Sequence, residues 1–166
     1  MDPGAAADLL AELPEDQSDA ILEEMEPEER QEVEELLEFD ENSAAGAMTT
    51  DFVYLGTDAT VSQVGAALRS YDGDLEAVTE IYLLDEKRVL RGAVPLARLV
   101  MAQPDTQLIV LAEARVLSCP ADMRQFDLAE MFDKYNLHAL PVIDSQARMV
   151  GVVHADHVIG FLREKL

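Results

Sequence analysis

An internal repeat constrains the fold of this chain more than any other feature of its sequence. The stretch IYLLDEKRVLRGAVPLARLV, residues 81–100, aligns with LPVIDSQARMVGVVHADHVI, residues 140–159. In each copy an apolar run ends at an aspartate, and a glycine lies seven residues later in a second apolar run. These residues are Asp85 and Gly92 in the first copy, Asp144 and Gly151 in the second. Aspartate favours turns and glycine supplies positive φ or close packing, so each copy predicts a strand hairpin.

A helix is predicted ahead of each hairpin, because TDATVSQVGAAL (residues 57–68) matches ADMRQFDLAEMF (residues 121–132). The repeating unit is therefore helix, strand, turn, strand, helix, about 60 residues long and present twice. A repeat of this length predicts two similar α/β modules that pack together, since neither can cover its sheet alone.

The acidic residues are distributed unevenly along the 166 residues, whose net charge is -22. Residues 1–47 contain 17 Asp and Glu against one Arg, whereas residues 48–166 contain 17 against 11 Lys and Arg. Nucleic acid and anionic lipid both need clustered basic residues, so this composition excludes nucleic acid as a partner. Cations or basic protein surfaces are the partners that it favours.

Short helices joined by prolines are predicted for residues 4–47. Pro14 and Pro27 stand where new helices would begin, a position at which the missing proline N–H costs nothing. We predict three helices of two to three turns. Helices this short are marginal alone, so they must pack on one another or on a neighbouring domain.

The location predicted for this chain is the cytosol. Cys119 is the only cysteine, so no disulfide can form within the chain, and the acidic N-terminus does not resemble a secretory signal. No apolar run approaches the roughly 20 residues that span a bilayer, so we expect a soluble chain without direct membrane insertion.

No catalytic motif supports an enzyme. Cys119 precedes Pro120 without a nucleophile motif around it, and a small buried apolar role suits it better. His154 and His157 share one helical face, where they hold a soft metal with Asp156, form an interface contact or are spaced so by chance. We therefore predict a non-catalytic protein.

The repeat resembles a tandem pair of CBS domains, the Bateman module. The stretch LPVIDSQARMVGVVHADHV is similar to that family's apolar-Pro-Val strand, Asp turn, Gly-containing strand and helix, and the likeness covers about residues 48–166. Further left, the acidic helices and the stretch from Ala44 to Thr49 resemble the junction between the N domain and the first CBS domain of MgtE magnesium transporters. The fold class expected is α + α/β: an acidic helical segment at 1–47, a first CBS domain at 48–106 and a second at 107–166.

Resemblance to the MgtE family implies a homodimeric Mg2+ sensor that dimerises through its CBS domains. Ions between acidic faces of the N domain and the CBS domains would favour a compact state that closes the pore. It also implies that most of the N domain precedes residue 1 and that a transmembrane transporter domain follows Leu166. The chain would then lie on the cytoplasmic face of the cell membrane.

The Mg2+ ligands that the resemblance implies are six acidic residues: Asp40, Glu41, Asp122, Asp144, Asp156 and Glu164. The first two precede the junction to the CBS pair. Alternative roles remain open: a solvated helix face for the glutamates before the junction, a helix N-cap for Asp122, a turn former for Asp144 and a surface charge for Asp156. Asn42 stands where the family often has an acid, which lowers the expected affinity or moves the site by one residue. Arg124 stands where the family often has a second acid after the one that matches Asp122, which weakens the expectation of a site there.

Adenosine-nucleotide sensing is the first alternative, because many CBS pairs bind adenosyl ligands between their modules. The residues that the resemblance implies for this role are Pro141, Val142, His154, His157 and Arg98. The family's ribose-holding hydroxyl and carboxylate are absent from both copies, where Pro95 and Arg98, then His154 and His157, replace them. Arg98 cannot accept a hydrogen bond from a ribose hydroxyl, although it can contact phosphate. A ligand-free protein-interaction adaptor is the second alternative.

Overall fold

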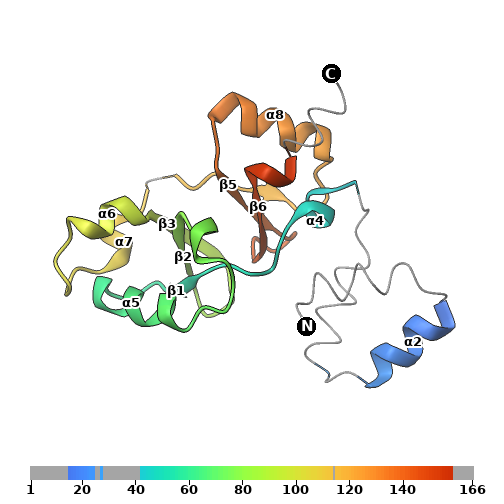
Figure 1. Ribbon diagram of the computed structural model, residues 1–166, viewed down its shortest axis with the longest axis horizontal. Helices are drawn as coiled ribbons and strands as arrows, with labels where there is room; N and C mark the ends of the chain where they lie inside the picture. The colour runs from blue at the N-terminus through green and yellow to red at the C-terminus, as the bar shows by residue number, and fades with distance from the viewer. Residues whose placement is uncertain (1–14, 25–26, 28–41, 114, 159–166) are drawn as a thin grey trace.

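The computed structural model describes residues 15–24, 27, 42–113 and 115–158 (Figure 1). Its elements, in chain order, are α2 (Glu15–Glu24), α4 (Ala44–Ala47), β1 (Tyr54–Gly56), α5 (Val61–Arg69), the 3-10 helix η1 (Leu75–Ala77), β2 (Glu80–Leu84), β3 (Leu90–Pro95), α6 (Leu96–Val100), α7 (Leu108–Leu111), β4 (Cys119–Pro120), α8 (Gln125–Tyr135), β5 (Ala139–Ile143) and β6 (Met149–His154). Within the described residues the structure has the paired α/β modules that the sequence predicted, and the fold class is confirmed.

Two three-stranded sheets carry the two copies of the repeat, in the orders β1-β2-β3 and β4-β5-β6. Each predicted hairpin is present as an antiparallel pair, β2 with β3 and β5 with β6, and a short strand adds to each in parallel. The register is the same in both copies, since Tyr82 lies opposite Ala93 and Pro141 lies opposite Val152. The two modules are thus built alike, strand for strand.

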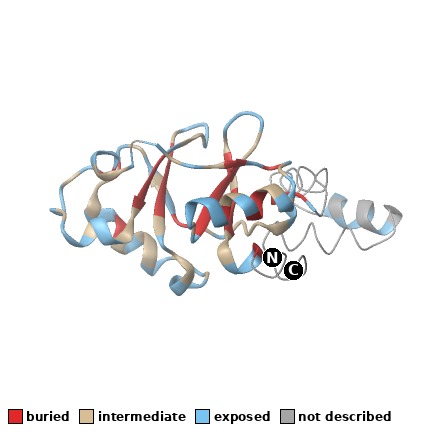
Figure 2. Cartoon of the chain, turned by 90° about the horizontal axis from the view of Figure 1, so that it is seen from above, coloured by how far each residue is buried: buried red, intermediate tan, exposed pale blue. Residues whose placement is uncertain are grey.

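Helices cover one face of each sheet and bury the apolar residues of the strands (Figures 1 and 2). In the first module, Val64 of α5 and Leu108 of α7 pack with Ile81 of β2. In the second, Leu128 and Phe132 of α8 pack on the strands and on Cys119 of β4. Cys119 is fully buried, which confirms the small apolar role predicted for it.

Each hairpin turn is closed by its aspartate and by a residue in the left-handed backbone region. Asp85 accepts hydrogen bonds at one carboxylate oxygen from the backbone N–H groups of Lys87 and Val89, at 2.9 and 3.0 Å. Arg88 has φ of 68° and Ala147, its counterpart in the second turn, has φ of 63°. The predicted turn role of the aspartates is therefore present in both copies.

The glycines of the repeat serve close packing, and the alternative of positive φ is wrong, since none of the described glycines has it. A Cβ on Gly92 would lie 3.1 Å from the Ala112 Cβ. A Cβ on Gly151 would lie 2.5 Å from the Met48 sulfur and 2.8 Å from the Thr49 carbonyl oxygen. Each glycine thus leaves room for a neighbouring segment to lie against the middle of a strand.

The two modules meet along their hairpins. The Leu90 N–H donates to the Ala147 carbonyl oxygen at 3.2 Å, and the Met149 N–H donates to the Arg88 carbonyl oxygen at 3.0 Å. A shared apolar core lies beside these bonds and includes Tyr82, Leu84, Ala93, Ala139, Met149 and Val152. Backbone pairing and a common core together fix the modules against each other.

Residues 42–49 pack on the second module before the chain enters the first, and we refer to them as the strap. Ala44 is fully buried in the core of the second module, and its N–H donates to the Met123 carbonyl oxygen at 2.7 Å. Thr49 pairs with Val152 of β6 through two backbone hydrogen bonds of 2.8 and 2.9 Å. The first module is thus reached only after the chain has crossed the second.

The N-terminal prediction falls mostly outside the described residues. The helix expected after Pro14 is present as α2, which starts at Glu15. The boundary expected between residues 106 and 107 stays a prediction, although Leu108 packs in the core of the first module.

Candidate functional site

One edge of the second sheet brings together two of the predicted Mg2+ ligands. Asp122 follows β4 and Asp144 follows β5, and these strands run parallel with Pro120 opposite Ile143. The Ala121 N–H donates to the Ile143 carbonyl oxygen at 2.9 Å, so the chain leaves both strands side by side. We refer to Asp122 and Asp144 as the acidic edge.

The two carboxylates of the acidic edge differ in the number of hydrogen bonds and ion pairs that they already make. One oxygen of Asp144 accepts from the N–H groups of Gln146 and Arg148, at 2.9 and 3.0 Å, and the other accepts from the Arg148 Nε at 2.7 Å. A carboxylate has about four lone-pair sites, so about one remains on Asp144. Asp122 is exposed and has no ion pair with the described residues.

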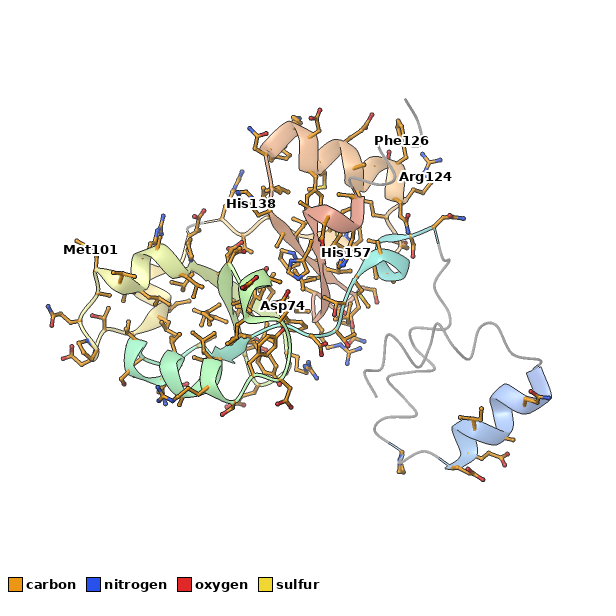
Figure 3. All side chains as sticks on the ribbon, in the orientation of Figure 1. Asp74, Met101, Arg124, Phe126, His138 and His157 are labelled. Carbon is orange, nitrogen blue, oxygen red and sulfur yellow. The ribbon has the colours of Figure 1, made fainter. Side chains whose placement is uncertain are left out.

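The strap leads the acidic segment to this edge. The Asn42 carbonyl oxygen accepts from the Gln125 N–H at 2.8 Å, and the Ser43 carbonyl oxygen accepts from the Gln125 side-chain amide at 3.1 Å. Arg124 directly precedes α8 (Figure 3), and its Nε lies 3.5 Å from a carboxylate oxygen of Asp127. Arg124 also occupies the N-cap of α8, so the alternative N-cap role for Asp122 is wrong.

Asp40, Glu41 and Glu164 lie outside the described residues, so their roles as ligands stay predictions. Asn42 places the chain immediately after Glu41 beside the start of α8. Within the described residues, no three His, Cys, Asp or Glu side chains are grouped so that they could hold a metal. Two carboxylates still suit Mg2+, which often keeps several waters and binds proteins through one or two carboxylates.

Asp156 is not part of the acidic edge. It lies just after His154, which stands opposite Ala139 at the other end of β5 from Asp144. Its neighbours are the histidine pair: the His154 N–H donates to Nδ1 of His157 at 3.4 Å, and the two ring centroids are 5.6 Å apart. Burial lowers the pKa of His154 and the nearby His157 lowers it further, while the carboxylates of Asp156 and Asp74 oppose this shift.

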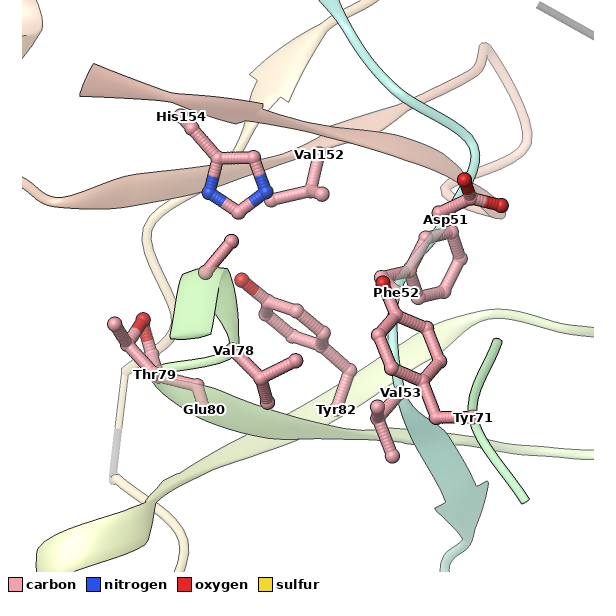
Figure 4. Close-up of a pocket in the computed structure, with 11 residues that line it drawn as sticks. Asp51, Phe52, Val53, Tyr71, Val78, Thr79, Glu80, Tyr82, Val152 and His154 are labelled. Atoms are coloured by element: carbon pink, nitrogen blue, oxygen red, sulfur yellow. The ribbon is translucent and has the colours of Figure 1, made fainter. Parts of the chain in front are cut away.

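Two clefts related by the repeat lie between the modules, and only one is roomy. The narrow cleft has a volume of about 20 Å³ and is lined by Tyr71, Tyr82 and His154, among others (Figure 4). The open cleft has a volume of about 310 Å³, and Glu80, Glu113, Arg115, His138 and Pro141 contribute to its walls.

The side chain at one repeat position accounts for the difference. Tyr82 is aligned with Pro141, and its ring occupies the narrow cleft, where burial raises its pKa well above the ordinary value. At the same place in the open cleft stands the small ring of Pro141. Of the two clefts, only the open cleft therefore has room for a bulky ligand.

Only two of the five predicted nucleotide-binding residues line these clefts, one in each. Pro141 lines the open cleft and His154 the narrow one, whereas Val142 is fully buried opposite Cys119 and lines neither. Arg98 donates to the Leu111 carbonyl oxygen at 2.8 Å and lies 3.6 Å from Glu113, so its guanidinium is already engaged. His157 is exposed beside His154.

Acidic residues of the open cleft were missed by sequence reasoning. Burial raises the pKa of Glu80, and the nearby Glu113 carboxylate raises it further. Arg115 and His138 line the same cleft and are its basic groups. The alignment of Tyr82 with Pro141 is the sequence signal that distinguishes the two clefts.

Comparison with known proteins gives matches over both parts of the chain. The MgtE intracellular N domain family matches residues 1–42, and the CBS domain family matches residues 111–164. The magnesium transporter MgtE of Thermus thermophilus is 34% identical over 138 residues, which are 83% of this chain and 31% of that protein. The chain thus spans about a third of this curated relative.

Two solved structures share the fold along nearly the whole chain. The soluble part of a magnesium transporter has a TM-score of 0.84 at 28% identity, covering 99% of this chain and 64% of that one. The cytosolic domain of the Mg2+ channel MgtE in complex with ATP has a TM-score of 0.81 at 31% identity, covering 97% and 66%. No helix of the described residues is long and apolar enough to cross a membrane. The chain belongs to the MgtE family of magnesium transporters and corresponds to its cytosolic region, the end of the N domain followed by a CBS pair.

Proposed function

We propose that this chain is a non-catalytic Mg2+-sensing region that regulates a magnesium transporter on the cytoplasmic face of the membrane. The observation that carries the proposal is the strap, whose Asn42 is hydrogen-bonded at the start of α8 beside Asp122. The acidic segment, with 17 Asp and Glu against one Arg in residues 1–47, is thereby joined to the acidic edge.

Electrostatic repulsion gives the sensor its two states. Two carboxylates ~5 Å apart repel by about 1 kcal/mol in water-like surroundings, so the acidic segment resists approach to the acidic edge without ions. A Mg2+ ion bound between them attracts both carboxylates, so the net interaction between the acidic segment and the acidic edge becomes favourable. Asp122 and Asp144 would supply carboxylates from the CBS side, and Asp40 and Glu41 from the other. Several weak sites that bind only the compact state add their free energies and shift its population steeply.

Small-angle scattering and thermal unfolding with a Mg2+ titration test this function. We expect the radius of gyration to fall and the melting temperature to rise at millimolar Mg2+, beyond the effect of NaCl at equal ionic strength. Asp122→Asn should weaken this response, and Asp127→Asn, which changes the charge of a nearby acid on α8, is the matched control. No response to Mg2+, or an equal loss in both variants, would refute the proposal.

Adenosine-nucleotide sensing is the second candidate, and the open cleft favours it. Its volume of about 310 Å³ is at the lower end of ligand pockets, which span roughly 300–1,000 Å³. A relative 31% identical to this chain has been solved in complex with ATP. Calorimetry with ATP, AMP and adenosine tests it, and Pro141→Tyr, which copies the residue that occupies the narrow cleft, should abolish any binding.

The assembly that we propose around this chain is a homodimer formed through the CBS domains, with a transmembrane transporter domain attached. The curated relative of T. thermophilus is a magnesium transporter about three times longer than the matched region, which supports such a context. If neither Mg2+ nor nucleotide binds and the acidic helices capture a partner protein, the chain is an adaptor instead.

A further inference from the structure

The open cleft contains a carboxylate and a guanidinium that do not neutralise each other. Glu80 and Arg115 both line this cavity of about 310 Å³. No ion pair joins them, and neither pairs with any other of the described residues. Two opposite charges therefore border one cavity without touching.

The other charges beside the cleft are already balanced. The Glu113 carboxylate lies 3.6 Å from the Arg98 guanidinium, which also donates to the Leu111 carbonyl oxygen at 2.8 Å. Glu113 and Arg98 thus offset each other. The charges left for a ligand, among the described residues, are those of Glu80 and Arg115.

The surroundings of Glu80 favour a cation beside it. Its side chain is half-buried, and burial raises its pKa, which the nearby Glu113 carboxylate raises further. Both effects disfavour the ionised carboxylate, and an ammonium group in the cleft would offset both. Glu80 also contributes to the narrow cleft, but that cavity of about 20 Å³ holds no more than a water molecule (Figure 4).

The backbone holds both charged residues at fixed places in the first module. Glu80 begins β2 and lies opposite Pro95 of β3. The segment that contains Arg115 is tied to the same strand, because the Glu113 N–H donates to the Ala93 carbonyl oxygen at 3.2 Å. The separation of the two charges is therefore set by the sheet.

The cleft surface around these charges is largely apolar, and both modules contribute to it. Its apolar lining includes Ala93, Pro95, Val116, Leu137, Leu140 and Pro141. A nucleoside triphosphate would place several negative charges beside Glu80 and Glu113. A molecule with one cationic group, one anionic group and an apolar body matches the lining better.

We propose that the open cleft binds a small zwitterion of the amino-acid class, with its ammonium group at Glu80 and its carboxylate at Arg115. An arginine guanidinium matches the geometry of a carboxylate and binds it through two parallel hydrogen bonds. This ligand is neither the Mg2+ of the sensor nor the nucleotide of the second candidate function, so the inference goes beyond both.

Calorimetry of the whole chain in EDTA tests this ligand class with matched probes. L-phenylalanine has both charged groups, phenethylamine has the cation alone and 3-phenylpropanoate has the anion alone. We expect each of the two analogues to bind at least roughly tenfold more weakly than L-phenylalanine.

Two variants assign the groups to their residues. Glu80→Gln should weaken L-phenylalanine to about the affinity of 3-phenylpropanoate, and Arg115→Gln to about that of phenethylamine. Glu86→Gln, at an exposed acid of the first turn that lines neither cleft, is the matched control and should change nothing.

Any of four results would overturn the proposal. They are no binding of L-phenylalanine or L-leucine, equal binding of the two analogues and the amino acid, an affinity that neither cleft variant changes, and binding of ATP where neither amino acid binds. The last result would assign the cleft to the nucleotide function. All of these measurements exclude Mg2+, so their failure is separate from a failure of the Mg2+ titration.

Discussion

Replacing Gly151 with alanine should detach the strap from the second module. The new Cβ would lie 2.5 Å from the Met48 sulfur and 2.8 Å from the Thr49 carbonyl oxygen. The methionine side chain can move, but the Thr49 backbone cannot do so without stretching its two hydrogen bonds to Val152. The strap must therefore shift as a segment.

The expected cost of this substitution is about 2–4.5 kcal/mol in the free energy of unfolding. Overpacking costs about 1–3 kcal/mol and each weakened backbone hydrogen bond about 1 kcal/mol. Against this, alanine restricts the unfolded chain and returns about 0.4–1 kcal/mol. The φ of Gly151 is not positive, so no backbone strain adds to the total.

Urea denaturation and hydrogen exchange measure the effect, with Gly92→Ala as the matched control. At Gly92 the nearest atoms to a new Cβ are side-chain carbons at 3.1 and 3.3 Å, so the same change should cost about 1 kcal/mol or less. In Gly151→Ala the Thr49 N–H should also exchange faster than in the parent chain. The reasoning fails if Gly151→Ala is as stable as the parent, or if Gly92→Ala is destabilised as much.

Three further outcomes are expected. Asp144→Ala removes three hydrogen bonds in its turn and should lower the urea midpoint by an amount equal to about 1–3 kcal/mol, whereas Asp122→Ala should change it little. Because burial lowers the pKa of His154, the folded state binds a proton at this side chain less readily than the unfolded state does. The free energy of unfolding should therefore fall as the pH drops below about 6.5. His154→Gln should flatten this pH dependence in unfolding curves. Burial raises the pKa of Cys119 to about 12, so a thiol reagent at pH 8 should label it only when urea unfolds the chain.

The regular parts of the fold could be predicted because the repeat encodes them twice. The Asp turn, the apolar runs on both sides of it and the helix ahead of them are local patterns, and all of them appear in the structure. Strands β1 and β4 are only three and two residues long, too short for any periodicity to show. Helix α7 is only four residues long, too short for a helical period to show, and its Leu108 lies in the core of the first module.

The sequence predicted residues of the candidate site but not their arrangement in space. Asp122 and Asp144 are acids in a suitable family context, but their meeting at one edge depends on β4 pairing with β5, a contact between segments far apart in sequence. Arg88 in the left-handed region and Arg98 bound to Leu111 depend likewise on tertiary structure. Local sequence patterns do not specify contacts between residues far apart in the chain.

The strap attaches the acidic segment to the second module before the chain enters the first. Its residues contribute to the core of the second module and pair with β6, whereas β1 of the first module begins only at Tyr54. A force on the acidic segment therefore acts first on α8 and β6, and it reaches the first module through the shared hairpins and through residues 50–53, which lead into β1. Because the second module also contains the acidic edge, an ion bound there and a pull through the strap act on the same body. Gly151→Ala, which loosens the strap without touching an acid, should then weaken the compaction by Mg2+ at unchanged charge, and scattering on that variant measures this coupling directly.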